Sequence, residues 1–235
     1  MARTRTSSKP ESEPIASAEE KSRLPYPIVQ AAAKLFRKHG FAGVSMREIA
    51  EAVQLSKAGL YHHCPSKEGL LAEMVRVAGE LLVEQLDATR KVAGSPRERI
   101  HAFLISRLQL VAEYRDLFAI IFQERPLLSG ASFGDVAKSA EKYRSGVRQL
   151  LQEAQKAGEL RSGVDIHLLM LAIDGMTGWA CLWYRPDGKQ RPEMIAEAFW
   201  SFLAEGVLSG QDTGPNASAS RLRTTRNLRL RTASG

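Results

Sequence analysis

Residues 44–71 have the sequence VSMREIAEAVQLSKAGLYHHCPSKEGLL, and this stretch carries the strongest structural signal of the chain. Ser45 followed by Glu48 is a capping box, so a helix is predicted to begin directly after Ser45. Ser56 is a suitable N-cap for a second, short and polar helix. Pro65 ends that helix, because a proline disfavours helix at the residue before it. Two short helices joined by a tight turn are typical of a helix-turn-helix, whose second helix enters the major groove of DNA.

The stretch from Ile28 to Leu71 resembles the N-terminal domain of the TetR family of bacterial transcriptional regulators. The resemblance is carried by the leading helix IVQAAAKLFRKHGF, by SMREIA, and by the run L-S-x-x-x-L-Y-x-H-x-x-S-K-E-x-L-L. Cys64 departs from the family, which usually has phenylalanine there, and we expect a looser contact behind the second helix without loss of the fold. The resemblance implies a three-helix DNA-binding unit followed by a helical domain that dimerises and holds a small ligand.

Helical periodicity covers almost all of the chain, and no alternating run is long enough to predict a strand. We therefore predict an all-α, TetR-like architecture of nine helices. Their expected bounds are 27–39, 46–53, 57–63, 66–92, 96–113, 115–125, 133–157, 165–184 and 192–208. The segment LLSGASFG at 127–134 is predicted to be a loop.

This pattern divides the chain into four parts. A disordered arm is predicted over 1–25 and a helix-turn-helix DNA-binding domain over 26–71. An effector-binding and dimerisation domain is predicted over 72–210, followed by a disordered arginine-rich tail over 211–235.

The last predicted helix carries more apolar side chains than one core-facing stripe needs. These residues are Ile195, Ala198, Phe199, Phe202, Leu203 and Val207. The resemblance implies that the last two long helices of each subunit form a four-helix interface in a homodimer. A two-fold dimer also suits DNA recognition, because a single short helix contacts too few base pairs for useful specificity.

The composition is that of a folded cytoplasmic protein. Hydrophobic residues make up 44% of the 235 residues, enough for a real core. Cys64 and Cys181 form no disulfide framework, which favours a reducing compartment. The N-terminus lacks the apolar segment of a secretory signal. The longest apolar run, Leu168 to Tyr184, is short for a membrane span and contains Asp174, so we expect a buried helix and no membrane partner.

The net charge of +7 is unevenly distributed. The residues after Asp212 hold five arginines and no acidic residue, which leaves 28 basic and 26 acidic residues in the rest of the chain. Between Ile28 and Lys67, six lysines and arginines outnumber two glutamates. That local excess is what a phosphate-binding surface needs. The arginines of the tail either attract DNA only weakly or add to non-specific binding.

The candidate DNA contacts lie on and around the second helix of the motif. They are Ser45, Arg47, Ser56, Lys57, Ala58, Gly59, Tyr61, His62, His63 and Lys67. Through the resemblance, Tyr61, His63 and Lys67 match positions that contact DNA phosphates. The alternative is that Tyr61 packs within the small domain and Lys67 is only solvated. The N–H and hydroxyl of Ser45 are placed to bind phosphate at a helix N-terminus, alongside the capping role of this residue.

Base contacts are expected from the long basic side chains. Arg47 and Lys57 are the best candidates, because both can donate to guanine O6 and N7. Ala58 and Gly59 offer only close approach, for instance to a thymine methyl group. His62 is expected to contact the DNA backbone or to be exposed.

We expect no metal, no cofactor and no enzymatic activity. His62, His63 and Cys64 are consecutive, and adjacent helical residues point about 100° apart, so they cannot converge on one ion. The sequence contains no CxxC or HExxH pair, no glycine-rich phosphate loop and no nucleophile elbow.

A ligand pocket is expected in the second domain, since an effector must bind one conformation better than another to change DNA affinity. Its candidate lining is Phe103, Arg107, Phe118, Phe122, Tyr143, Met170, Asp174, Trp179 and Trp183. Each of these residues has core packing as its alternative role. Asp174 interrupts an apolar helix and needs a partner if it is buried; the partner is a ligand, a group across the dimer, or water.

The segment GWACLWYRPDGKQRPEMIAEAF resembles one subgroup of the family, several members of which respond to acyl-CoA thioesters. This resemblance implies that Arg107 and Arg144 meet CoA phosphates and that aromatic residues hold the acyl chain. Gly178 departs from the subgroup, many of whose members have asparagine there.

The sequence thus predicts a homodimeric repressor that binds double-stranded operator DNA and is released by a small hydrophobic or acyl-CoA-type metabolite. Two alternatives remain open. One is an activator or DNA-organising protein without an effector, with a pocket filled by its own side chains. The other is a ligand-binding protein whose DNA-binding unit has lost its function, against which Tyr61, His63 and Lys67 argue.

Overall fold

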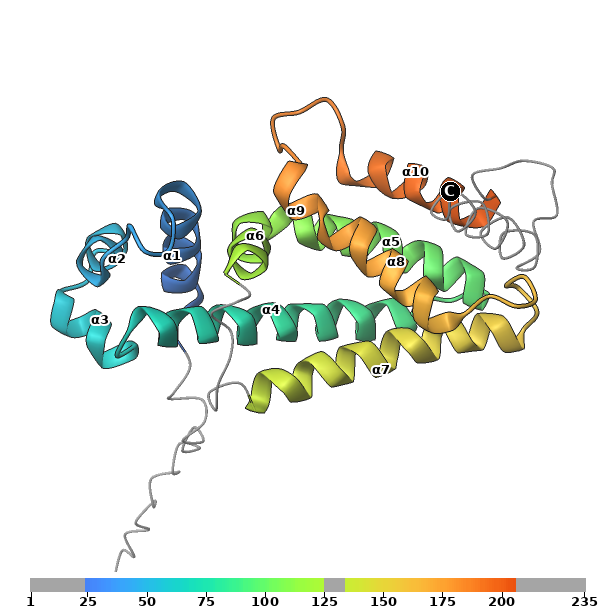
Figure 1. The fold of residues 1–235 in the computed structure, drawn as a ribbon, viewed down its shortest axis with the longest axis horizontal. Helices are drawn as coiled ribbons and strands as arrows, with labels where there is room; N and C mark the ends of the chain where they lie inside the picture. The colour runs from blue at the N-terminus through green and yellow to red at the C-terminus, as the bar shows by residue number, and fades with distance from the viewer. Residues whose placement is uncertain (1–23, 125–133, 206–235) are drawn as a thin grey trace, which may run out of the picture. The chain divides into compact units, whose positions relative to one another are not determined.

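The computed structural model of the chain describes residues 24–124 and 134–205. These residues form ten helical segments and no strand (Figure 1). The segments are α1 (Tyr26–His39), α2 (Met46–Ala52), α3 (Lys57–His63), α4 (Lys67–Arg90), α5 (Pro96–Glu113), α6 (Arg115–Gln123), α7 (Gly134–Lys156), α8 (Ile166–Gly178), α9 (Ala180–Trp183) and α10 (Pro192–Glu205). The predicted all-α fold is confirmed. The tail, Val207, most of the arm and all but the last residue of the predicted loop lie outside the described residues.

The helix predicted over 165–184 is divided in two, so the nine predicted helices become ten segments. α8 ends at Gly178 and α9 begins at Ala180. Trp179 between them keeps helical backbone angles (φ -61°, ψ -21°), and the N–H of Leu182 donates to its carbonyl (3.1 Å). This is the shorter spacing of a 3₁₀ turn. Glycines near the end of α8 weaken the α-helix just before this point, so the chain tightens there and then continues as helix.

The described residues up to Glu73 form one compact unit, and those from Met74 onward form a second. The boundary falls inside α4, which therefore contributes to both units. The expected domain boundary at residue 71 lies close to this point.

The first unit builds α1, α2 and α3 around a small apolar core. The buried side chains of α1 are Ile28, Val29, Ala32, Ala33 and Phe36, all on one helical face. Leu60 of α3 and Leu70 of α4 are fully buried as well. Leu24 is also buried, and its N–H donates to Oε1 of Glu73 (3.3 Å). The last residues of the predicted disordered arm therefore belong to the folded unit.

Local signals fix the turns of the first unit. Ser45 forms the predicted capping box with Glu48. Gly40, after α1, has a φ of 77°, in the left-handed region that glycine adopts without strain. Gln54 has a φ of 57° and turns the chain between α2 and α3.

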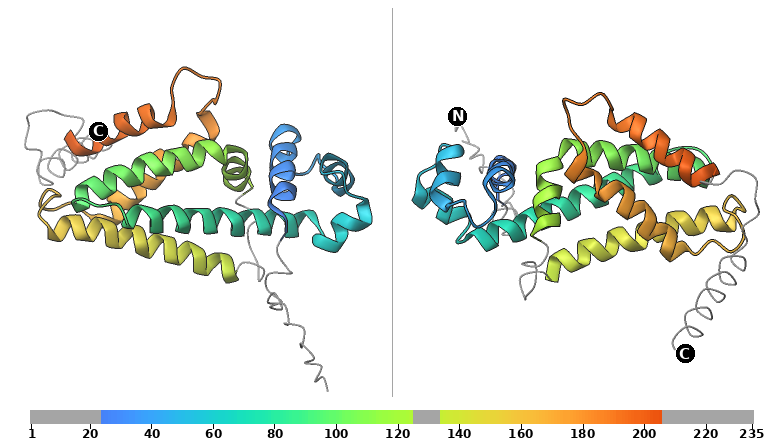
Figure 2. Two further views of the ribbon diagram at one scale, coloured as in Figure 1. Left: turned by 180° about the vertical axis from the view of Figure 1, so that it is seen from behind. Right: turned by 45° about the horizontal axis from the view of Figure 1, so that its top comes forward.

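α5 is the central helix of the second unit. One apolar cluster joins Phe103 of α5 to Leu86 of α4, Leu150 of α7 and Met170 of α8. A second cluster joins Leu108 of α5 to residues of α6, α9 and α10. α10 lies alongside α5 in each view (Figures 1 and 2).

The prediction that Leu168 to Tyr184 form a buried helix is wrong for one face. Met170 and Ile173 pack into the core, whereas Leu168 and Leu171, on the opposite face of α8, are 62% and 51% exposed. The stretch Ile166–Trp183 is long and apolar enough to cross a membrane, but only 28% of it is buried and a single such helix is a weak indication of a span. When both faces of a helix are apolar, the sequence does not show which face packs against the core.

Candidate functional site

α3 presents most of its side chains to solvent. Ser56 caps the helix, because its Oγ accepts a hydrogen bond from the N–H of Gly59 (3.0 Å). Leu60 is buried and anchors the helix in the core. The exposed side chains are Lys57, Ala58, Tyr61, His62 and His63. A capped helix with one buried anchor thus leaves a polar face free for a partner.

Tyr61 is the large side chain of this face and is 42% exposed. Nζ of Lys57 lies 5.7 Å from the centre of its ring. The exposure disfavours the alternative in which Tyr61 packs within the small domain. A phenol and an ammonium group are therefore offered together, which suits contact with a phosphate backbone.

Lys67, at the start of α4, holds the preceding turn in place. Its Nζ donates to the carbonyl oxygens of Phe41 (2.9 Å) and Ala42 (3.3 Å) and lies 4.9 Å from the centre of the Phe41 ring. The alternative of a merely solvated Lys67 is wrong. An ammonium group has three donors, so one remains beyond these two carbonyls.

Two other candidate contacts already have partners on α2. Both the N–H and the hydroxyl of Ser45 donate to Oε2 of Glu48 (2.7 Å each). Nε of Arg47 donates to Oε1 of Glu51 (2.7 Å), an exposed ion pair. The hydrogen bonds from Ser45 lower the pKa of the Glu48 carboxyl. Phosphate contact by Ser45 requires exchange of its bonds, whereas Arg47 uses only Nε in its ion pair and keeps its Nη groups for a base contact.

Cys64 closes α3 from the core side. It is buried, its Sγ donates to the carbonyl of Ser66 (3.2 Å), and burial raises its pKa. The rings of His62 and His63 meet edge to face with centres 5.8 Å apart. Within the described ranges, no group of three or more histidine, cysteine, aspartate or glutamate side chains is placed to hold a metal ion.

The second unit contains a cavity of about 290 Å³ among α4, α5, α6, α7 and α8. Four of the nine predicted effector-binding residues line it: Arg107, Phe118, Tyr143 and Asp174. Arg144, the other arginine singled out from the sequence, lies on its wall as well. The cavity thus gathers the polar part of the predicted pocket.

The other five predicted residues do not line this cavity. Phe103 and Met170 are buried in the core cluster, where the ring of Phe103 lies 6.5 Å from that of Tyr143. Phe122, Trp179 and Trp183 are 43%, 52% and 40% exposed. The rings of Phe122 and Trp179 meet edge to face, with centres 5.3 Å apart.

Sequence reasoning missed most of the apolar wall. The missed residues are Val75, Ala78, Gly79, Leu82, Ile121, Ser139 and Ala140. A Cβ added to Gly79 would lie 3.1 Å from Cβ of Ser139, so α4 and α7 approach closely here. Small residues on two long helices were the available signal, but one sequence does not show which helices face each other.

Arg107 is the unusual residue of the cavity. It is only 6% exposed, and its Nε and Nη1 have no hydrogen-bond partner. Its guanidinium lies 5.4 Å from the ring centre of Phe118 and 5.7 Å from that of Tyr143. Buried polar groups are normally satisfied, and one that is not needs an explanation.

Asp174 is the acidic group of the cavity. Its Oδ1 accepts a hydrogen bond from the hydroxyl of Tyr143 (3.2 Å). Burial raises the pKa of Asp174, against the opposing charge of Arg107. Burial also raises the pKa of Tyr143. Of the three partners expected for Asp174, the structure supplies a different one, a tyrosine of its own subunit.

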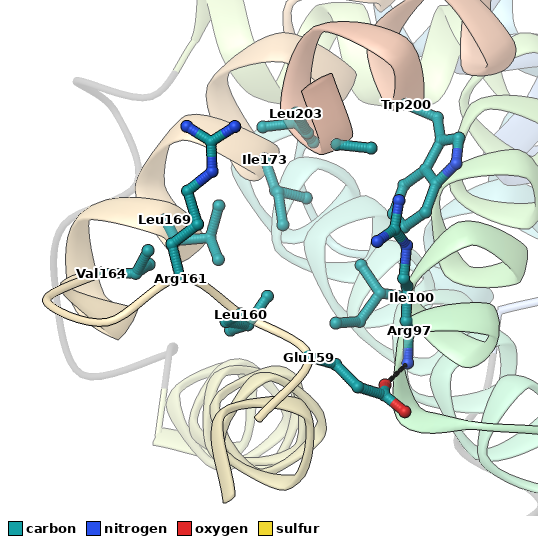
Figure 3. Close-up of a pocket in the computed structure, with 11 residues that line it drawn as sticks. Arg97, Ile100, Glu159, Leu160, Arg161, Val164, Leu169, Ile173, Trp200 and Leu203 are labelled. Carbon is teal, nitrogen blue, oxygen red and sulfur yellow. Dashed lines mark hydrogen bonds between the residues drawn. The ribbon is translucent and has the colours of Figure 1, made fainter. Parts of the chain in front are cut away.

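A second cavity, of about 280 Å³, lies between the start of α5, the α7–α8 connection, α8 and α10 (Figure 3). Its lining is mostly apolar and includes Leu160, Leu169 and Ile173, with Ile173 drawn between Arg161 and Trp200. The guanidinium of Arg97 lies 5.5 Å from the ring centre of Trp200. None of the predicted ligand residues lines this cavity.

The two units together define a class of protein. A capped helix-turn-helix with an exposed basic and aromatic face, joined to a helical unit with a ligand-sized cavity, is the organisation of a ligand-responsive DNA-binding regulator. Residues 28–74 match the model of the bacterial regulatory proteins of the tetR family, and residues 93–207 match the Tetracyclin repressor-like C-terminal domain. The chain belongs to the TetR family of transcriptional regulators.

Several transcriptional regulators are similar to this chain over most of their length. The HTH-type transcriptional repressor KstR2 of Mycolicibacterium smegmatis is 25% identical over 186 residues, which cover 78% of this chain and 90% of that protein. The TetR family regulator PfmR of Thermus thermophilus has a TM-score of 0.71 and 31% identity, over 77% of this chain and 98% of that chain. AibR, solved in complex with isovaleryl coenzyme A and operator DNA, has a TM-score of 0.66 and 32% identity, over 75% of this chain and 95% of that chain.

Proposed function

We propose that this chain is a homodimeric, cytoplasmic repressor that binds double-stranded operator DNA and leaves it when a small acyl compound, such as an acyl-CoA, binds the second unit. The observation that supports DNA binding most strongly is the solvent-exposed polar face of α3, a helix capped by Ser56 and anchored by Leu60. Lys57 is available to base edges, while Tyr61, His63 and Lys67 meet phosphates. Arg47 joins them through its Nη groups, and Ser45 joins them when it exchanges its partner on α2.

The dimer is supported by a second apolar stripe on each of α8 and α10. On α8 and the residue after it, the exposed positions recur every three or four residues: Leu168, Leu171, Ala172, Gly175 and Trp179. On α10 they are Met194, Ala198 and Phe202. These stripes lie opposite the faces that pack in the core, and contiguous exposed apolar surface marks an interaction site. A second copy of the chain is the partner that supplies the same two stripes through a two-fold axis.

The effector part is supported by the cavity around Arg107. Its volume of about 290 Å³ is near the lower end of the range of roughly 300–1,000 Å³ typical of ligand pockets. It therefore takes an acyl group but not a whole coenzyme A. Arg144 is exposed and paired with Glu141 (2.9 Å), so it is better placed than the buried Arg107 to meet CoA phosphates outside the cavity. An open cavity also disfavours the alternative of a regulator whose pocket is filled by its own side chains.

The test is fluorescence anisotropy with duplex DNA from upstream of the protein's own gene, across a salt series, with and without a panel of acyl-CoAs. We expect tight binding that weakens steeply with salt, because phosphate contacts release counterions, and relief by one member of the panel. The variants Tyr61→Ala and Lys57→Ala should weaken binding, whereas Lys91→Ala, an exposed lysine of the second unit, should not. Specific DNA binding that no acyl-CoA of the panel reverses would contradict the proposed acyl-CoA effector. Equal affinity for unrelated DNA would contradict the proposed operator binding.

A further inference from the structure

Arg107 identifies the chemistry of the ligand that the cavity takes. A guanidinium is always charged and always a donor, and this one is buried with two of its nitrogens unpartnered. Leaving a buried charged donor unsatisfied is costly. The ring faces of Phe118 and Tyr143, the Tyr143 hydroxyl and the carboxyl of Asp174 stabilise the guanidinium, but none of them accepts a hydrogen bond from Nε or Nη1. The cavity therefore lacks one component, an acceptor atom beside Nε or Nη1.

Apart from Ser139, Arg144 and the Tyr143–Asp174 pair, the rest of the wall is apolar. Val75, Leu82 and Ile121 come from α4 and α6, and the small residues Ala78 and Ala140 leave the space open. A ligand that fits has a compact apolar body and a single polar end. A space of about 290 Å³ suits a small apolar body of this kind.

We propose that the cavity binds a short acyl compound whose acyl oxygen, a carboxylate oxygen or a thioester carbonyl oxygen, accepts hydrogen bonds from Nε or Nη1 of Arg107. This inference rests on the proposed effector role of the same cavity and adds the side chain that holds the ligand. Arg107 is the anchor of the acyl oxygen, and the wall of small and apolar residues sets the length of the chain.

The charge of Asp174 should distinguish the two kinds of ligand, free carboxylic acids and thioesters, by the pH dependence of their affinity. The charged and titratable groups that face it are Arg107 from α5, and Tyr143 and Arg144 from α7. With Asp174 ionised, it balances the charge of Arg107, and a second carboxylate would be repelled. A free acid therefore binds together with a proton, and its affinity rises as the pH falls toward the raised pKa of Asp174. A thioester brings no charge into the cavity, so its affinity changes little over the same range.

The experiment is isothermal titration calorimetry on the full chain without DNA, so that its outcome is independent of operator binding. The ligands are matched series of four to eight carbons: carboxylic acids, their CoA thioesters and the corresponding alcohols, each at pH 6 and pH 8. We expect binding by the acids or the thioesters and not by the alcohols. The variant Arg107→Gln should weaken it by about 10- to 100-fold, the size of a lost charge-assisted hydrogen bond.

Two further variants keep the test decisive if Arg107→Gln does not fold. Ala140→Leu fills the cavity around Arg107, and Leu203→Phe fills the second cavity shown in Figure 3. Loss of acyl binding in Ala140→Leu but not in Leu203→Phe supports the assignment. The inference is overturned by the opposite pattern, by alcohols that bind as tightly as acids and thioesters, or by the absence of binding throughout both series. DNA binding measured on the same samples shows separately whether the proposed regulator stands.

Discussion

Single side chains of the first unit have structural roles beside the DNA contacts proposed for them. Lys67 is attached by two hydrogen bonds to the turn after α1 and keeps one donor free. Its role as a phosphate contact was predicted from the family pattern, but its structural role was not. The two carbonyls lie 26 and 25 residues away in sequence, and one sequence contains no record of such contacts. The same residue therefore fixes the frame of α3 and contributes charge to its surface.

Lys67→Met is expected to reduce both stability and DNA affinity. Loss of hydrogen bonds from a charged, partly exposed donor should lower the free energy of unfolding by about 1–2 kcal/mol. Lys57→Met is the matched control, because the Lys57 ammonium lies over the Tyr61 ring on an exposed face; it should weaken DNA binding and leave stability nearly unchanged. Urea unfolding and anisotropy on both variants measure the two effects. Equal stability losses in both variants would contradict the structural role of Lys67.

Glu48 should make the first unit lose stability as the pH falls into the acidic range. Its folded pKa is lowered by hydrogen bonds from Ser45, so the ionised carboxylate is favoured in the folded state. The resulting stability is fully present above the unfolded pKa of about 4.5 and is lost as the pH falls through the lower, folded pKa. We expect Glu48→Gln to show a smaller loss of stability below pH 4.5 than the unmodified chain.

Thermal unfolding at several pH values between 3 and 6 checks this dependence. Glu51→Gln is the control, since Glu51 lies on the same helix but outside the capping box and pairs with Arg47. If Glu48→Gln and the unmodified chain lose stability in parallel, the capping box does not cause the dependence.

Of the predicted ligand residues, both charged ones line the cavity around Arg107, whereas most of the aromatic ones do not. Asp174, Arg107 and Tyr143 line the same cavity, because a charged residue inside an apolar segment is costly to bury unless polar partners lie beside it. Trp179, Trp183 and Phe122 were expected beside them but are on the surface. A large aromatic residue on an amphipathic helix serves a core, a cavity or an interface equally well, so its type alone does not distinguish these roles.

At the level of helices, the boundaries followed from caps and breakers. The predicted capping box Ser45–Glu48 forms, the structure adds a second box, Ser95–Glu98, at the start of α5, and Asp165 caps the start of α8. The division of one predicted helix at Trp179 was missed, because glycines inside a helical pattern lower helix stability without specifying a break. Helix ends were thus predictable from local chemistry, whereas the choice of the core-facing side was not.

The exposed stripe of α8 makes a testable prediction about assembly. Leu171→Glu changes a residue that is 51% exposed in the single chain, so the fold should survive. In the proposed dimer it buries a charge on each side of the two-fold axis, and the dimer Kd should rise by about 30-fold or more.

Analytical ultracentrifugation over a concentration series measures this Kd. Gln152→Glu adds the same charge at an exposed position of α7 and should leave the Kd unchanged. An unaltered dimer in Leu171→Glu would exclude α8 from the interface, and a chain that is monomeric at all concentrations would exclude the dimer.

Over the molecule as a whole, the proposed function assigns DNA binding to the first unit and ligand binding to the second. The sequence predicted this division from one motif and from the helical pattern that follows it, and the family assignment agrees with it. The place and size of the cavity were beyond prediction, because they depend on how five helices pack. In the proposed dimer, the exposed stripes of α8 and α10 connect the two functions, since a dimer would present two copies of α3 to one duplex.

Operator binding by the full chain is best tested by selection of DNA sites from a random duplex pool, followed by sequencing of the bound fraction. We predict enrichment of one sequence made of two inverted half-sites, because two copies of α3 are related by a two-fold axis. Enrichment should be lost in Tyr61→Ala and reduced in Leu171→Glu. A pool that gains no sequence preference, or one that gains the same preference with Tyr61→Ala, would contradict the assignment of this chain as an operator-binding regulator.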